Sequence, residues 1–79
     1  MNEKKFDCYY VTIDGSIDGL STCYSGNKYE NYSMAFEMFK ILVQAYVLII
    51  NTNITLSVIG SNKDNTDMTV LNWIKIDNK

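Results

Sequence analysis

The two cysteines, Cys8 and Cys23, are the side chains of this sequence best suited to covalent or metal chemistry. A thiol needs a neighbouring base to act as a nucleophile, and a structural zinc site needs four cysteine or histidine ligands. The sequence has no histidine and no third cysteine. We therefore expect both thiols to be reduced and dispensable, and we expect no catalytic residue, no metal site and no cofactor.

Four aspartates lie in two short segments, Asp14–Gly19 and Asn62–Asp67, where they would be candidates for binding a hard cation. Neither segment has the regular spacing of oxygen ligands that a calcium loop requires. Asp beside Gly or Asn is, in contrast, the usual composition of a turn. We interpret both segments as turns.

The composition argues against several classes of function. With 47% apolar and 20% charged residues, the chain lies outside the composition range of disordered proteins. At 79 residues it forms one core at most, because smaller units bury too little apolar surface. A net charge of -2 and the absence of arginine argue against nucleic-acid binding by direct phosphate contact. We expect a single domain spanning residues 1–79, with a frayed N-terminus at residues 1–5.

Two features of the sequence bear on its cellular location. Residues Met1–Phe6 carry charges but are not followed by the apolar segment of a secretory signal. The longest apolar stretch is interrupted by Glu37, Lys40 and Gln44, so we expect no membrane span. Frequent Asn, Ile, Lys and Tyr are typical of an AT-rich coding sequence. We therefore expect a cytoplasmic protein of a bacterial host cell.

The first third of the chain predicts a β-hairpin. The aromatic and β-branched run at residues 6–13 is typical of a strand. We place the following turn at Gly15–Asp18, which sets Ile13 opposite Leu20 and gathers the large apolar side chains on one face. In that register the two cysteines lie within about one residue of facing each other.

The middle of the chain predicts a helix. The periodicity becomes helical at Ser33, and either Asn31 or Ser33 is available as the N-cap. We expect the helix to run from Tyr32 to about Ile50. The β-branched run that ends there is the least certain part of this assignment, because such residues also favour strands.

Two further strands complete the predicted fold. Residues 54–59 alternate as a strand, and residues 68–76 form the last one. In the last strand we expect Val70, Ile74 and Ile76 to face inward and Leu71, Trp73 and Lys75 to face the other side. The fold class is therefore α+β, with the order ββαββ: a four-stranded, mostly antiparallel sheet with one long helix packed on one face.

The predicted helix has more apolar surface than one sheet can cover. At ~100° per residue, its polar side chains share a narrow arc, and the set centred on Leu42 faces the sheet. Apolar residues recur every seventh position on each side of that set. One flank is Met34, Ile41 and Leu48, and the other is Phe36, Val43 and Ile50. Either the protein's own loops cover these flanks, or a partner or a second copy does.

Aromatic residues provide the other candidate contacts. Tyr24, Tyr29 and Tyr32 alternate with small polar residues, which is a composition typical of binding loops, although core-capping tyrosines in an ordinary loop would look the same. Trp73 on the outer side of the last strand is a candidate anchor, because tryptophan is enriched in binding hot spots. It would be part of the core if that side is covered.

Taken as a sequence, the chain favours a small, non-enzymatic protein-interaction module. We expect it to form a homodimer and to modulate or inhibit a larger protein partner. In size, acidity and lack of chemistry it is similar in type to many phage and mobile-element accessory proteins, including inhibitors of bacterial defence systems, although no residue pattern carries that similarity. The alternative is a small-molecule binding protein or minimal enzyme with a tyrosine-lined pocket between helix and sheet.

Overall fold

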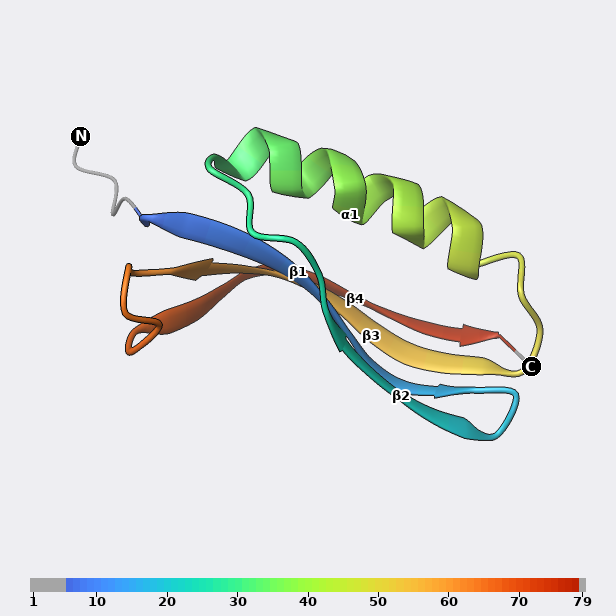
Figure 1. Cartoon of the computed structure of the whole chain (residues 1–79). Helices are drawn as coiled ribbons and strands as arrows, with labels where there is room; N and C mark the ends of the chain where they lie inside the picture. The colour runs from blue at the N-terminus through green and yellow to red at the C-terminus, as the bar shows by residue number, and fades with distance from the viewer. Residues whose placement is uncertain (1–5, 79) are drawn as a thin grey trace.

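The computed structural model describes residues 6–78 and consists of one sheet and one helix (Figure 1). The elements in chain order are β1 (Cys8–Ile17), β2 (Leu20–Ser25), α1 (Tyr32–Tyr46), β3 (Thr52–Ser61) and β4 (Met68–Asn78). The four strands form one antiparallel sheet in the order β2-β1-β3-β4, and α1 lies across one face of it. The predicted ββαββ fold is confirmed. The predicted frayed N-terminus at residues 1–5 lies outside the described residues.

The core forms where α1 packs on the two central strands, β1 and β3. Successive side chains of a strand point to opposite faces, so every second residue of these strands points toward the helix. The buried apolar cluster consists of Val11, Ile13, Ala35, Phe39, Ile54, Leu56, Val58 and Ile76.

The first hairpin differs from the predicted one. β1 continues to Ile17, and a two-residue turn at Asp18-Gly19 leads into β2. Both turn residues have positive φ, 52° and 82°, as in the type I′ turns that Asp-Gly favours. Ile13 therefore faces Tyr24 rather than Leu20, and the longer loop predicted from the sequence is wrong.

Helix α1 begins as predicted but ends earlier. The side chain of Asn31 accepts a backbone N–H of the first turn at 3.0 Å and forms the N-cap. The helix ends at Tyr46 rather than Ile50, because residues 47–51 turn back toward the sheet and Asn51 takes a left-handed conformation with φ 62°. Asn tolerates this conformation better than most side chains do.

Hydrogen bonds from both sides hold this turn in place. The side-chain amide of Asn78, at the end of β4, donates to the carbonyl oxygens of Val47 and Ile49 at 2.8 and 2.9 Å. The backbone N–H of Asp18 donates to the carbonyl oxygen of Asn51 at 2.7 Å. The turn after α1 is thus attached to both β4 and the β1–β2 turn.

A β-bulge changes the face of two residues in β4. The register shifts between Val58 and Ile59, so that Ile59 pairs with Val70 and Leu71 is the extra residue. Val70 consequently shares the face of Ile59, away from the helix, whereas Leu71 reaches the helix side near Gly60. The predicted orientations of Val70 and Leu71 are therefore wrong, while the remainder of β4 faces as predicted.

Candidate interaction surfaces

The sheet face opposite α1, which we call the open face, has no helix or strand packed on it among residues 6–78 (Figure 1). Its side chains alternate along each strand with those of the core. Large side chains gather at one end of it, on the adjacent strands β1, β3 and β4. We call this group the Trp73 patch: Tyr10, Ile59, Met68, Val70 and Trp73.

The sheet register brings the members of the Trp73 patch together. Tyr10 pairs with Ile59, and Ile59 pairs with Val70 across the bulge. Trp73, Val70 and Met68 are 62%, 54% and 51% exposed. Trp73 therefore lies on the predicted face, where no helix or strand of residues 6–78 covers it. The β3–β4 loop covers only the neighbouring end of that face, where Asn65 accepts hydrogen bonds from the hydroxyl groups of Tyr10 and Ser61. The sequence did not identify the other four members, since the bulge turns Val70 outward and the sheet register brings Tyr10 and Ile59 beside it.

Short polar side chains occupy the rest of the open face. The register places there Ser21, Cys23 and Ser25 of β2, Thr12, Asp14 and Ser16 of β1, Asn53, Thr55 and Ser57 of β3, and Lys75 and Asp77 of β4. The open face is thus apolar at one end and polar at the other.

The two predicted helix flanks lie in different environments. Phe36 and Val43 are partly buried against the core. The Phe36 ring stacks between those of Tyr32 and Phe39, at centroid distances of 5.5 and 5.8 Å. The third predicted member, Ile50, lies in the turn after α1 and is exposed. This flank is therefore covered internally over most of its length.

The opposite flank is exposed to solvent. Met34 and Ile41 are about half exposed, and Leu48 is 81% exposed and lies beyond the helix end. Leu48 instead belongs to an apolar end of the molecule, where the turn after α1 approaches the β1–β2 turn that carries Leu20. This end was not expected from the sequence, because the apolar pattern of the predicted helix continues through these residues.

The three predicted binding tyrosines are spread over three elements. Tyr24 lies exposed on β2, and Tyr32 begins α1. Tyr29 forms an isolated bridge with Tyr9 through two backbone hydrogen bonds of 2.8 and 2.9 Å. Tyr24 and Tyr29 do share the wall of a pocket of about 120 Å³ between helix and sheet. The other residues lining it are Val11, Gly26, Asn27, Met38 and Leu42.

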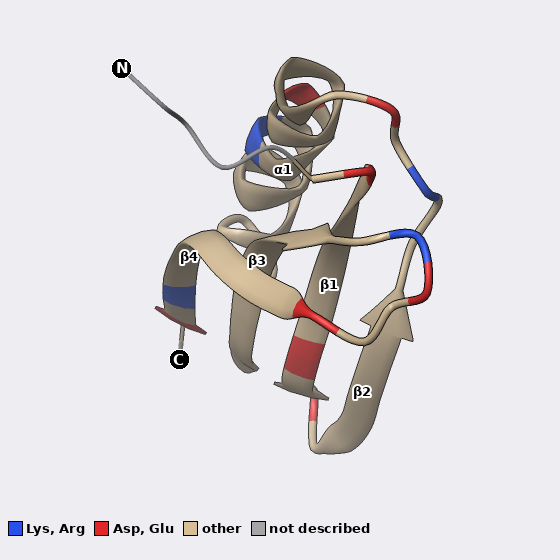
Figure 2. Ribbon diagram, turned by 90° about the vertical axis from the view of Figure 1, so that its left-hand side faces the viewer, with Lys and Arg blue, Asp and Glu red and all other residues tan. Residues whose placement is uncertain are grey.

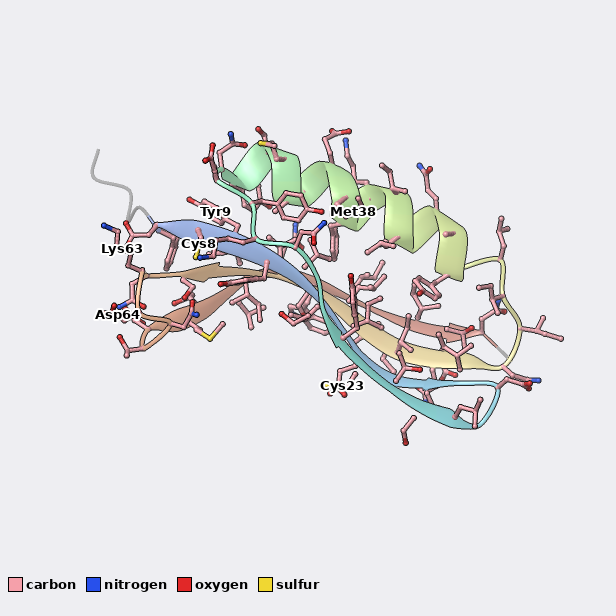
Figure 3. All side chains as sticks on the ribbon, viewed as in Figure 1. Cys8, Tyr9, Cys23, Met38, Lys63 and Asp64 are labelled. Carbon is pink, nitrogen blue, oxygen red and sulfur yellow. The ribbon has the colours of Figure 1, made fainter. Side chains whose placement is uncertain are left out.

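The two cysteines do not lie opposite each other. Cys8 pairs with Ser61 at the start of β1 and is buried, whereas Cys23 pairs with Asp14 and is exposed on the open face (Figure 3). Asp14, the residue of β1 opposite Cys23, lies six residues after Cys8 along the strand, or about 20 Å away. The predicted near-facing arrangement is therefore wrong, because it rested on the wrong hairpin register. Within residues 6–78, no three acidic, cysteine or histidine side chains group as metal ligands would.

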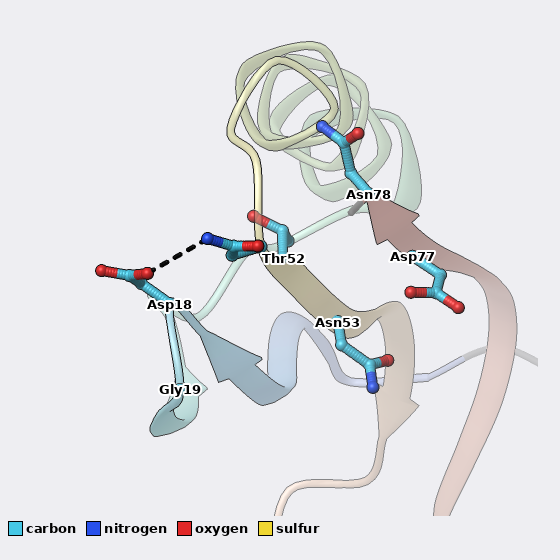
Figure 4. A pocket seen from close by; sticks show the side chains of 7 residues that line it. Asp18, Gly19, Thr52, Asn53, Asp77 and Asn78 are labelled. Carbon is cyan, nitrogen blue, oxygen red and sulfur yellow. Dashed lines mark hydrogen bonds between the residues drawn. The ribbon is translucent and has the colours of Figure 1, made fainter.

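A broad polar hollow of about 350 Å³ lies at the end of the sheet where the turn after α1 meets β3 (Figure 4). Its two carboxylates, Asp18 and Asp77, belong to segments on opposite sides of β3 and point away from each other. They do not form a cation site. Thr52 also lines the hollow, and its hydroxyl oxygen is buried without a hydrogen-bond partner among the described residues.

Acidic and basic residues are interspersed over the described part of the chain (Figure 2). Glu37 and Lys40 form one ion pair on the exposed side of α1 at 2.8 Å, and Lys40 also lies over the Phe36 ring. No basic stripe of the kind that follows a phosphate backbone is visible among residues 6–78.

Comparisons with protein families, with curated proteins and with solved structures found no match for this chain. Within the described residues, no helix has both the length and the apolar character that crossing a bilayer requires. The open face and the exposed helix flank therefore have to be interpreted from their own geometry.

Proposed function

We propose that this chain is a non-enzymatic protein-interaction module that modulates or inhibits a larger protein by covering part of its surface, and that also associates with itself. The observation that carries the proposal is the Trp73 patch on the open face. Trp73 is 62% exposed and lies beside two half-exposed apolar neighbours. In a folded chain of this size, such an exposed apolar group is typical of a surface that a partner buries.

The chemistry of the patch fits protein recognition. Buried tryptophans anchor many interfaces, and complete burial of each large apolar side chain contributes about 1.5–3 kcal/mol. The polar remainder of the open face resembles the rim of an interface, where short hydroxyl groups form hydrogen bonds with little loss of side-chain entropy. The two free thiols fit a reducing compartment, and we propose the cytoplasm of a bacterial host as the site of action.

The alternative function, binding of a small molecule, has one observation in its favour: the tyrosine-lined pocket between helix and sheet. Its volume of about 120 Å³ is below the ~300–1,000 Å³ of ordinary ligand sites. A pocket of this size accommodates a single side chain, so it also fits a partner protein that inserts one residue beside Tyr24.

An affinity-capture experiment with matched variants tests the proposal. The tagged chain is used as bait in an extract of its native host, together with the double variant Trp73→Ser/Val70→Ser and the control Leu20→Ser. Leu20 is also exposed but lies at the opposite end of the sheet, beside the β1–β2 turn. We expect a protein captured by the wild type and the control, but not by the patch variant, in quantitative mass spectrometry. Capture that is equal for all three baits would contradict a role for the open face.

A further inference from the structure

Strand β4 is an edge strand of the described sheet. It is the longest strand, with 11 residues from Met68 to Asn78, and among the described strands it pairs with β3 alone. An edge strand presents unpaired N–H and C=O groups to any other strand, and natural proteins protect such edges with proline, charge or a bulge. β4 has no proline, and its bulge lies at Leu71. Within the regular segment Asn72–Asn78, the N–H of Trp73 donates to the side-chain oxygen of Asn72 at 2.9 Å, so the open part of the edge runs from Ile74 to Asn78.

Apolar groups line this edge on the helix side. Helix α1 packs on β1 and β3 and leaves the helix-side residue Ile74 of β4 39% exposed. The turn after α1 reaches over the end of β4, where Asn78 binds the carbonyl oxygens of Val47 and Ile49. Both of these apolar side chains are exposed. The edge from Ile74 to Asn78 thus has apolar side chains beside it as well as unpaired backbone groups.

On the open face the same edge carries two charges in a self-complementary arrangement. Lys75 pairs with Thr55 and Asp77 with Asn53, so both charged side chains point to the open face, and both are exposed. In an antiparallel pair of two β4 strands related by a two-fold axis at Ile76, each Lys75 lies opposite the Asp77 of the other copy. A pair centred on Lys75 would instead oppose two lysines, and a pair centred on Ile74 would extend into the bulge. Opposite charges across a strand pair stabilise it, and like charges destabilise it.

We propose that two copies of this chain pair through their β4 edges, antiparallel and centred on Ile76, into one continuous eight-stranded sheet. This inference rests on the self-association in the proposed function and names its surface. Both helices then lie on one side of the joined sheet and both open faces on the other. The regular pairing from Ile74 to Asn78 is short, so the dimer is a weak and reversible one, with a Kd on the order of micromolar to tens of micromolar.

A charge-swap series tests the pairing. Asp77→Lys and Lys75→Asp each place like charges opposite each other twice in the dimer, whereas the double variant Lys75→Asp/Asp77→Lys restores both attractive pairs. The control is Asp14→Lys, which changes an exposed charge on the open face of β1, away from the edge. Sedimentation velocity over about 1–300 µM protein, a range set by the expected affinity, measures the monomer–dimer equilibrium.

We expect each single variant to raise the Kd of the dimer about tenfold or more. The Kd of the double variant and that of the control should both lie within about threefold of the wild-type value. Single variants without effect, or a double variant as weak as the singles, would overturn the pairing. If the dimer survives the edge variants but is lost in Ile41→Glu, the exposed helix flank is the interface; self-association then stands and the β4 inference is wrong. If the wild type stays monomeric over the whole concentration range, both the β4 pairing and the proposed self-association are wrong. The affinity-capture experiment then remains the test of the Trp73 patch.

Discussion

Gly15 is the residue of β1 that no other amino acid can replace without strain. Its φ is 143°, and a Cβ atom there would meet the carbonyl oxygen of Asn53 and lie 2.7 Å from the Cα of Ile54. Both atoms belong to the backbone of β3, which cannot move without opening the central strand pair. Gly19, in the adjoining turn, also has positive φ but open space around it.

Gly15→Ala should therefore lower the free energy of unfolding by about 3 kcal/mol or more, because backbone strain and a steric clash add. The control Gly19→Ala should lower it by only about 1 kcal/mol, the strain term alone. Urea denaturation of both variants measures the difference. Equal losses would show that β3 moves aside to accept the methyl group.

Thr52 carries a polar atom that the fold does not use. Its side chain is 1% exposed, and its hydroxyl has no hydrogen-bond partner among residues 6–78. Thr52→Val replaces that hydroxyl with a methyl group of similar shape, so we expect the free energy of unfolding to rise by about 1 kcal/mol. Thermal melting should show an increase of about 4–8 °C for a domain of this size. Thr52→Ser, which keeps the hydroxyl and loses the methyl, should melt lower. A lower melting temperature for Thr52→Val would mean that the hydroxyl is satisfied in solution.

Single residues were predictable where local chemistry decides their role. Asn31 was one of two expected N-caps, and Trp73 was expected on the outer side of β4; both are found there. Val70 and Ile59 were not recognised as part of the same surface. Their contact depends on one extra residue in β4, and the glycine beside the bulge, Gly60, lies on the partner strand, where its missing side chain leaves room for Leu71.

At the scale of elements, the two flanks of α1 differ in their burial. Val43 is partly buried against the core, whereas Ile41, two residues earlier, is exposed. Val43→Glu should lower the free energy of unfolding by about 2–3 kcal/mol, because it desolvates a charge at the helix–sheet contact. Ile41→Glu should change it by no more than about 0.5 kcal/mol. Thermal melting at several protein concentrations measures both, and a large loss for Ile41→Glu at low concentration would contradict the exposed position of this flank.

The order and type of the elements followed from periodicity, but the exact boundaries did not, and two differences matter most: the first hairpin turn and the helix end. Asp-Gly occurs twice near the first turn, and the second one, Asp18-Gly19, forms the tight hairpin while Gly15 stays within β1. A two-residue Asp-Gly turn between Ile17 and Leu20 was the signal that would have given the register. The helix end was misplaced because Val47–Ile50 continues the apolar pattern, whereas hydrogen bonds from Asn78, far along the chain, hold these residues in a turn.

At the scale of the whole fold, the helix of residues 6–78 packs on only one face of the sheet. A domain of about 60–80 residues buries only about 60% of the surface that its unfolded chain exposes, and here the single helix covers one face only. The open face, the β4 edge and the apolar end beside Leu20 all follow from that limit. Surplus apolar surface was expected from the sequence, but on the helix flanks, since the exposure of the sheet depends on how four strands are ordered.

The strand order β2-β1-β3-β4 also makes one step of folding slow. The β1–β2 and β3–β4 pairs are local hairpins, but the central pair joins residues far apart, from Ile17 with Thr52 to Cys8 with Ser61. Closing such a long loop delays folding, so we expect refolding on a scale of milliseconds to seconds. Val58→Ala, in the central pair, should slow refolding in stopped-flow measurements, whereas Ile76→Val at the β4 edge should mainly speed unfolding. Equal effects on the refolding rate would place the β3–β4 hairpin in the transition state as well.

During synthesis, β1 is made well before its partner strand β3. Roughly 35 residues separate the end of β1 from the start of β3, and at about 5–20 residues per second the ribosome needs about 2–7 s to produce them. Throughout that interval the nascent β1–β2 hairpin has two open edges and an unburied apolar side. A second nascent chain on the same messenger offers an identical hairpin, so close ribosome spacing favours mispairing between chains, and slower initiation of translation should increase the yield of correctly folded protein.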